Sequence, residues 1–318
     1  MPLPRFELCV VSLGFVICVS GMACGQDYPG KPIRIVTGSP GGGTDLTARL
    51  IAQGIAGPLG QPVVVDNRGG SLPPEIVSQA PPDGYVLLYD GDSFMLGPLM
   101  EKMSYDPVKD FSPVIAAVRT INLIVVHPSL MVNSVNELIA LAKARPGALN
   151  YGSGPTGAAA NLAAEYFKVM AGVNIVRINY KGTGPAVSAL IGGEVQLVFA
   201  TPAVVLPHMK SGRLKALAIT STEPSAMFPG LPTVAASLPG YEAVSLYGLF
   251  APAKTPAALI KRLNQEVARF LKTAEAQERI LNAGLEVVAS SPEEFAVAMK
   301  SNIAKWSRVI KAAGIRSE

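Results

Sequence analysis

The stretch over residues 33–53 constrains the fold of this chain more than any other. It places a short apolar run before a bend that contains Gly41, Gly42 and Gly43, and an apolar-periodic run follows the bend. This order predicts a strand, a loop and a helix. Successive glycines let backbone N–H groups crowd around a guest, and the helix start adds positive potential. The bend is therefore predicted to bind an anion.

Phosphate is a poor fit for this bend. A P-loop ends in Gly-Lys-Ser/Thr, whose lysine and hydroxyl contact phosphate and magnesium. Here Thr44 and Asp45 follow the glycines, and the G-x-G-x-x-G spacing of a dinucleotide site is missing because two residues separate Gly38 from Gly41. Asp45 alternatively complements the dipole of the helix that it opens. A smaller, singly charged guest such as a carboxylate fits better.

The N-terminus has the pattern of a secretion signal. Arg5 precedes an uncharged apolar run over residues 8–19, which is too short to span a bilayer comfortably. Small residues then allow cleavage after Gly25, or lipid attachment at Cys24, for which Gly21 is a poor context. A buried N-terminal helix is a third interpretation. We expect a cleaved signal over residues 1–25 and a periplasmic protein.

Composition narrows the remaining function classes. All three cysteines lie in the predicted signal, so the mature chain would contain no disulfide, thiolate nucleophile or cysteine metal site. The net charge of +4 is mild and the basic residues are scattered, which argues against a nucleic-acid partner. The length that remains after cleavage favours two domains.

Strand and helix patterns alternate along nearly the whole chain, which predicts an α/β fold with mostly parallel sheets covered by helices. Another short strand, small-residue loop and helix, over residues 150–171, repeats the opening design. Two such loops that face each other would form a binding site between two α/β domains. Capping boxes at Ser134 and Ser291 and a cap at Thr273 are predicted to open three further helices.

Groups that would support catalysis are sparse in this sequence. The two histidines, His127 and His208, favour structural or surface roles, and they lack the spacing of a zinc pair. Asp90 and Asp92 lack the ligand array of a calcium loop and are expected to form a turn. No nucleophile elbow is present. We therefore expect a binding protein that uses no cofactor or metal, rather than an enzyme.

A series of short motifs covers the mature chain in order. They are Tyr-Pro-Gly-Lys-Pro-Ile-Arg from residue 28, Pro-Gly-Gly-Gly-Thr-Asp from 40, Gly-Gln-Pro-Val-Val-Val-Asp-Asn-Arg from 60, Pro-Asp-Gly-Tyr from 82, Tyr-Gly-Ser-Gly from 151, Asn-Tyr-Lys-Gly from 179, Leu-Ile-Gly-Gly-Glu-Val from 190, Leu-Pro-His-Met-Lys-Ser-Gly from 206, Leu-Pro-Thr-Val from 231 and Gly-Leu-Phe-Ala-Pro from 248. Together they resemble the Bug-family receptors, the extracytoplasmic solute-binding proteins of tripartite tricarboxylate transporters.

The resemblance implies a two-lobed, type II periplasmic-binding fold that closes on a small organic carboxylate. Lobe 1 would comprise residues 26–124 and 248–318, and lobe 2 residues 125–247, with hinge crossovers near residues 122–126 and 243–248. One loop from each lobe would hold the carboxylate through backbone amides, hydroxyls and bridging waters, with little direct salt bridging.

The resemblance also assigns ligand-binding residues. In the first-lobe loop they are Thr37, Ser39, Gly41, Gly42, Gly43 and Thr44. In the second-lobe loop they are Ser153, Gly154, Thr156 and Gly157. Tyr180 and Thr201 would line the cleft further out, with a packed hinge aromatic as the alternative for Tyr180.

Several positions depart from the family pattern and leave the ligand's identity open. Thr37-Gly38-Ser39 replaces a common Pro-Phe-Pro, Ala158 replaces a hydroxyl residue, and a histidine often found near Asn161 is absent. The segment over residues 69–74 is also unusual, and acids are frequent in the family at positions 196 and 200. The implied partners are the carboxylate and the membrane subunits of a transporter, served by a monomer. A module that presents its ligand to a membrane sensor kinase, or an exported enzyme on the same scaffold, are the alternatives.

Overall fold

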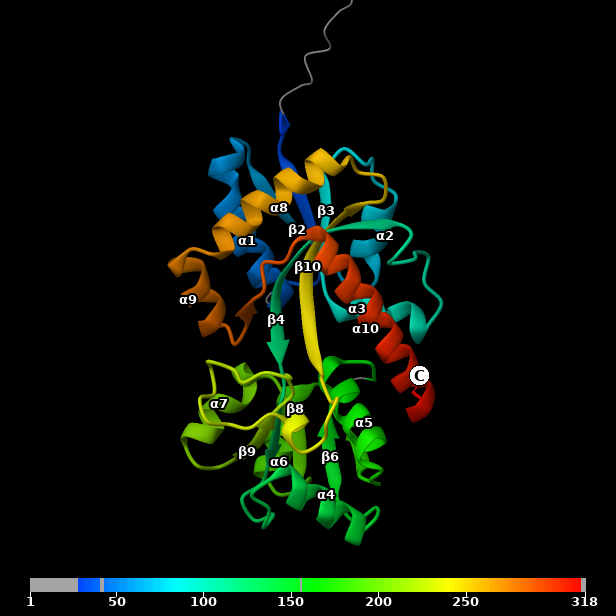
Figure 1. Cartoon of the computed structure of the whole chain (residues 1–318), viewed down its shortest axis with the longest axis vertical. Helices are drawn as coiled ribbons and strands as arrows, with labels where there is room; N and C mark the ends of the chain where they lie inside the picture. Colours follow the sequence, from blue (N-terminus) through cyan, green and yellow to red (C-terminus); the bar gives the residue numbers. More distant parts are fainter. Residues whose placement is uncertain (1–27, 41–42, 155, 316–318) are drawn as a thin grey trace, which may run out of the picture.

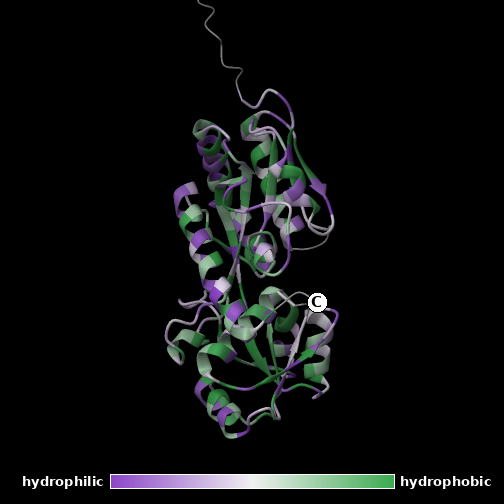
Figure 2. Ribbon diagram, turned by 90° about the vertical axis from the view of Figure 1, so that its right-hand side faces the viewer, coloured by the Kyte–Doolittle hydropathy of each residue, from purple (hydrophilic) through white to green (hydrophobic). Residues whose placement is uncertain are grey.

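The computed structural model describes residues 28–40, 43–154 and 156–315. The predicted signal over residues 1–25, and Gly41 and Gly42 of the first loop, lie outside the described residues. The two-lobed α/β fold is confirmed: two sheets, each flanked by helices, lie one above the other (Figure 1). Figure 2 shows that hydrophobic residues concentrate in the strands of both sheets.

The first lobe contains the N-terminal strand and helix of the predicted anion site. Among the described residues, its sheet has six strands in the order β11-β4-β10-β3-β1-β2. The strands are β1 (Ile33–Thr37), β2 (Val63–Asn67), β3 (Val86–Asp90), β4 (Phe111–Ile121), β10 (Val244–Pro252) and β11 (Glu286–Val287). The helices are α1 (Gly43–Leu59), α2 (Leu72–Ser78), α3 (Asp92–Leu96), the 3₁₀ helix η1 (Gly97–Leu99), α8 (Ala257–Leu271), α9 (Ala274–Asn282) and α10 (Pro292–Ala313).

The second lobe repeats this design on a smaller scale. Its sheet has five strands within the described ranges, in the order β7-β6-β8-β5-β9. They are β5 (Leu123–Val126), β6 (Asn150–Ser153), β7 (Val176–Asn179), β8 (Leu197–Ala200) and β9 (Lys215–Ile219). The helices are α4 (Val135–Ala144), α5 (Ala159–Ala171), α6 (Thr183–Ile191), α7 (Pro202–Lys210) and the 3₁₀ helix η2 (Val234–Ala236).

Both sheets are mixed, which corrects the expectation of mostly parallel sheets. The βαβ units are parallel as predicted: β1 pairs with β2 and β3, and β6 pairs with β7 and β8. The connecting strands run the other way: β10 is antiparallel to β3 and β4, and β5 is antiparallel to β8 and β9. The physical reason is that a chain which leaves one lobe and returns must enter each sheet against the direction of the βαβ strands.

Two crossovers join the sheets. The chain passes from β4 to β5 at Asn122 and returns through the segment before β10, which begins at Val244. Thr220, just after β9, bonds to both crossing segments at Asn122 and Ala243. The lobe boundaries inferred from the resemblance stay a prediction.

Helix α10 extends from the first lobe to the second and contacts both (Figure 1). It packs on β4 of the first lobe and on α5 of the second. Phe295, near its start, lies against Phe250 with ring centroids 4.8 Å apart, and Trp306 lies against Tyr166 at 5.8 Å. None of the described helices is long and apolar enough to cross a membrane.

The predicted caps have different outcomes. Ser291 forms a complete capping box with Glu294, and Thr273 accepts from the backbone N–H of Ala276. Ser134 accepts from the N–H of Glu137, but the Glu137 carboxylate reaches one residue further back and accepts from Asn133 instead. The box at Ser134 is therefore only half formed.

Candidate ligand-binding site

The predicted site residues gather where parallel strands end. Ser153 ends β6, Tyr180 follows β7 and Thr201 follows β8, while Thr37 ends β1. The carboxyl ends of neighbouring parallel strands share one edge of a sheet, and ligands bind in the crevice outside that edge. Each lobe therefore presents its loops from such an edge.

Thr37 is placed inside the first lobe rather than on its surface. Its side chain is fully buried, and its Oγ1 donates to the carbonyl of Tyr89 at 2.8 Å. Ser39 is exposed, and a Cβ on Gly69 would lie 3.8 Å from its hydroxyl. Thr44 is half-buried on the first turn of α1, which Gly43 opens. The role of each in ligand binding stays a prediction.

Asn67, at the end of β2, holds both ends of the first-lobe loop. Its Nδ2 donates to the Gly38 carbonyl and to Asp45 Oδ1, both at 2.8 Å. Arg49 donates to Asn67 Oδ1 at 2.6 Å and pairs with Asp45 at 2.9 Å. Asp45 thus does more than complement a helix dipole, because it ties α1 to β2. The sequence offered no signal for this arrangement beyond the Asp-Asn-Arg motif.

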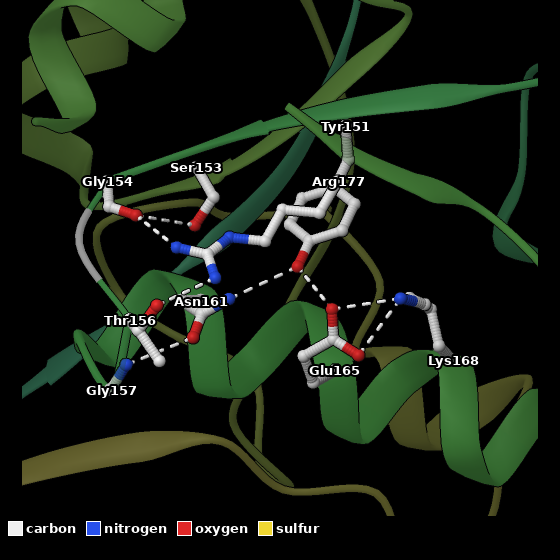
Figure 3. A network of polar contacts seen from close by, with 9 residues as sticks. All are labelled: Tyr151, Ser153, Gly154, Thr156, Gly157, Asn161, Glu165, Lys168 and Arg177. Atoms are coloured by element: carbon white, nitrogen blue, oxygen red, sulfur yellow. Dashed lines mark hydrogen bonds and ion pairs between the residues drawn. The ribbon is translucent and has the colours of Figure 1, made fainter. Parts of the chain in front are cut away.

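Arg177 on β7 anchors the second-lobe loop (Figure 3). Its Nη2 donates to the Gly154 carbonyl at 2.8 Å and its Nη1 to Thr156 Oγ1 at 2.9 Å. Ser153 is buried, and its Oγ lies 3.3 Å from the same carbonyl. The loop is therefore held from behind by a guanidinium that sequence reasoning did not identify.

Gly157 has a fixed place in this loop. It has φ +81°, in the left-handed region that favours glycine, and its N–H donates to Asn161 Oδ1 at 3.1 Å. This amide is already used within the protein. A Cβ on Gly157 would lie 2.6 Å from the Met100 sulfur, so the second-lobe loop reaches a residue that follows η1 of the first lobe.

A polar chain continues beneath the loop into α5 (Figure 3). Asn161 Nδ2 donates to the Tyr151 hydroxyl at 3.1 Å, and that hydroxyl donates to Glu165. Lys168 donates to both Glu165 oxygens at 2.9 Å. Burial, and then Glu165, raise the pKa of Tyr151, which keeps the phenol protonated as a donor. Each member therefore has a partner, and the start of α5 is held rigidly.

Tyr180 and Thr201 lie at the same strand edge. The Tyr180 N–H donates to the Ser153 carbonyl at 2.8 Å, and its hydroxyl lies 3.5 Å from Glu194. Its ring packs at the margin of a buried cluster of the second lobe. Thr201 precedes α7, is half-buried and makes no side-chain cap bond. Their predicted contacts with the distal part of the ligand stay predictions.

A pocket of about 580 Å³ lies between the lobes. Thr156, Gly157 and Ala158 form its second-lobe wall, at the N-terminus of α5. Its first-lobe wall comes from α2, the end of β3, α3 and the segment after η1, and includes Glu75, Asp90, Ser93, Phe94, Met100, Glu101, Lys102 and Tyr105. Sequence reasoning placed none of these first-lobe residues in the site.

The expected turn at Asp90 and Asp92 is wrong. Asp90 ends β3, Gly91 caps α3 and Asp92 opens that helix, whose five residues are too few to show a periodic pattern. Asp90 Oδ1 accepts from the N–H of Gly91 at 2.7 Å and from the Ser93 hydroxyl at 2.9 Å. Burial raises the pKa of Asp90 and of Asp92 to about 6.

Histidine, aspartate and glutamate side chains are common protein ligands of metal ions. Over the described ranges, no group of three or more His, Cys, Asp or Glu side chains is placed to hold a metal ion. His127 Nδ1 lies 2.7 Å from the Ser129 hydroxyl, and His208 Nδ1 lies 2.7 Å from an Arg213 nitrogen. Both rings therefore interact with near neighbours in the sequence.

Comparisons with known proteins agree with the sequence resemblance. The model of the tripartite tricarboxylate transporter family receptor matches residues 47–315. Protein BugT of Bordetella pertussis is 34% identical over 315 residues, covering 96% of this chain and 97% of that protein. The structure of R. palustris Rpa4515 with adipate has 35% identity and a TM-score of 0.76, covering 91% of this chain and 99% of that one.

A more distant structure has the same fold. MatC (Rpa3494) from Rhodopseudomonas palustris with bound malate has 28% identity and a TM-score of 0.72, and the match covers 89% of this chain and 100% of that one. The fold, the family model and the curated relatives agree over most of the chain. The protein therefore belongs to the family of tripartite tricarboxylate transporter receptors.

Proposed function

We propose that this protein is a periplasmic receptor that captures a small organic carboxylate between its lobes and delivers it to the membrane subunits of a tripartite transporter. Family membership and the relatives solved with adipate and malate support the ligand class. The pocket between the lobes, at the positive end of α5, supports the location.

The proposal rests mainly on the hydrogen bonding of the Thr156 hydroxyl. Arg177 Nη1 donates to Thr156 Oγ1, and this threonine lines the pocket. A hydroxyl has a single proton. Since Oγ1 already accepts from a cation, its own proton is available for an acceptor in the pocket. Arg177 thus polarises a donor toward the ligand without contacting it, which suits recognition of a carboxylate with little direct salt bridging.

Calorimetric titration tests the ligand class. The purified protein is titrated with mono-, di- and tricarboxylates and aromatic acids, and with sugars and simple amines as controls. We expect heat from at least one acid. Silence across the acids, together with binding of a sugar or a simple amine, would contradict the proposal.

Uptake measurements test delivery. Cells that lack this receptor should lose uptake of the acid that binds it, and a plasmid copy should restore uptake. If uptake stays normal while the acid changes phosphorylation of a membrane sensor kinase only when the receptor is present, the sensory alternative holds instead.

The proposal also includes export and cleavage of residues 1–25. Mass spectrometry of the protein from the periplasm should find an N-terminus at Gln26. A lipid-modified Cys24 in the membrane fraction would instead establish lipid anchoring. The same sample, analysed by size-exclusion chromatography with light scattering, checks the predicted monomer.

A further inference from the structure

The two walls of the inter-lobe pocket carry opposite electrostatic character. The second-lobe wall combines the N-terminus of α5 with Thr156, whose hydroxyl is polarised by Arg177. The first-lobe wall carries three carboxylates, those of Glu75, Asp90 and Glu101. The pocket therefore has a donor-rich end and an acidic end.

Asp90 is the deepest of these acids. It is only 9% exposed and lines the pocket. Its two hydrogen bonds, from Gly91 and Ser93, both end on Oδ1, so Oδ2 accepts none from the described residues. A buried carboxylate without a cation is unfavourable, and burial raises the pKa of Asp90 to about 6. A cationic group in the pocket would therefore stabilise the ionised form of Asp90.

The other carboxylates stand on the same side. Asp90, Glu101 and Glu75, in that order after burial, all raise the pKa of Tyr105, whose ring also lines the pocket. Within the described ranges, none of the three acids has an ion-pair partner. Lys102 also lines the pocket but is exposed, and one lysine cannot neutralise three acids. This wall is therefore negative at neutral pH.

We propose that the ligand of this receptor is a zwitterion, whose carboxylate faces the start of α5 and whose remote end carries a cationic nitrogen against Asp90 and Glu75. The inference rests on the proposed function and names the substrate class of the same site. A dicarboxylate in that place would set its second negative charge against the acidic wall. An ammonium group there pairs with Asp90 and lies beside the Tyr105 ring, which also favours cations.

The test compares ligands of equal length. For chains of four, five and six carbons, the protein is titrated calorimetrically with the monocarboxylate, the α,ω-dicarboxylate and the ω-amino acid. We expect the best ω-amino acid to bind at least about tenfold more tightly than its matched dicarboxylate, because the acidic wall attracts one end group and repels the other. Tighter binding of the dicarboxylate at every length overturns the inference.

Variants test whether the acidic first-lobe wall causes the preference for the ω-amino acid. Asp90→Asn keeps an acceptor for Gly91 and Ser93 and should lower the ratio of the ω-amino-acid affinity to the monocarboxylate affinity about tenfold. Thermal unfolding checks that each variant folds. If Asp90→Asn does not fold, the same titrations with Glu75→Gln test the acidic wall. Glu278→Gln, exposed on α9, is the matched control and should change neither affinity.

Different results would contradict the carboxylate-receptor function and the zwitterion inference. If mono- and dicarboxylates bind and neither wall variant alters the ranking, the zwitterion inference is wrong and the carboxylate receptor stands. If no acid in the series or in the wider panel binds, both are wrong.

Discussion

Asn122 and Thr220 hold each other at the first crossover between the lobes. The Asn122 N–H donates to Thr220 Oγ1 at 2.8 Å, and the Thr220 N–H donates to the Asn122 carbonyl at 2.9 Å. Thr220 Oγ1 then donates to the carbonyl of Ala243 at 2.7 Å, on the returning segment. One buried hydroxyl therefore joins both segments that cross between the lobes.

Replacing this hydroxyl should destabilise the protein. Thr220→Val leaves a buried N–H on Asn122 and a buried carbonyl on Ala243 without their partner, which costs about 2–4 kcal/mol of unfolding free energy. Urea denaturation measures the loss. Thr222→Val, at an exposed threonine two residues on, is the control and should change stability by less than about 0.5 kcal/mol. An equal loss in both variants would contradict the role of Thr220.

Arg177→Lys tests the loop anchor. Lysine keeps the charge but cannot direct two N–H groups at the Gly154 carbonyl and Thr156 Oγ1 together. We expect affinity for the bound carboxylate to fall about tenfold, because the loop loses its fixed geometry. Calorimetry gives the affinity, and Arg145→Lys, at an exposed arginine after α4, serves as the control. Undiminished binding would show that Arg177 does not shape the site.

Alanine substitutions at two glycines distinguish the effect of backbone strain from that of side-chain crowding. Gly157 and Gly193 have φ +81° and +77°, but a Cβ meets the Met100 sulfur at 2.6 Å only in the first case and open space in the second. Alanine at either position should cost about 1 kcal/mol of stability from the left-handed conformation. Gly157→Ala should in addition weaken ligand binding, since the end of the Met100 side chain, which lines the pocket, must move to make room for the new Cβ. Equal binding by the two variants would refute the contact.

Asp92 makes stability depend on pH. Burial raises its folded pKa to about 6 from 3.8, so the folded state holds a proton that the unfolded state has released between those values. Stability from this group is present below pH 4 and is lost as pH rises through 6. The groups that face it include Asp90, Lys305 and Tyr247.

Asp92→Asn removes that titration. The unfolding free energy of the variant minus that of the wild type should rise by about 2 kcal/mol between pH 4 and pH 7.5. Urea denaturation across this range measures it, with Glu278→Gln as the control. A difference that does not vary with pH would contradict the raised pKa of Asp92.

The sequence was most informative where structure is local. The apolar run, glycine bend and periodic run did become β1 and α1, and the capping box at Ser291 formed in full. These signals lie within a few residues of the structure that they specify. Helix α2 was missed because its first turn contains Pro73 and Pro74, which resemble a loop until their burial is known.

The side chains that hold the two loops in place could not be identified from local sequence patterns. Arg177 bonds to Thr156, 21 residues away, and Asn67 bonds to Gly38, 29 residues away. Nothing in the local pattern distinguishes these side chains from surface ones, because their partners are set by the stacking of strands. Thr37 is a further example, since its hydroxyl joins β1 to β3 by donating to the carbonyl of Tyr89, 52 residues away.

Helix α10 would constrain any movement of one lobe against the other. As a continuous rod of 22 residues, it is fixed to the first lobe near Phe295 and rests Trp306, only 2% exposed, beside the second-lobe Tyr166. Any swing of the lobes must slide or detach that aromatic contact as well as bend the crossovers. If ligand release requires such a swing, it also requires that the Trp306 indole become exposed to solvent, and α10 would then limit how far the lobes separate.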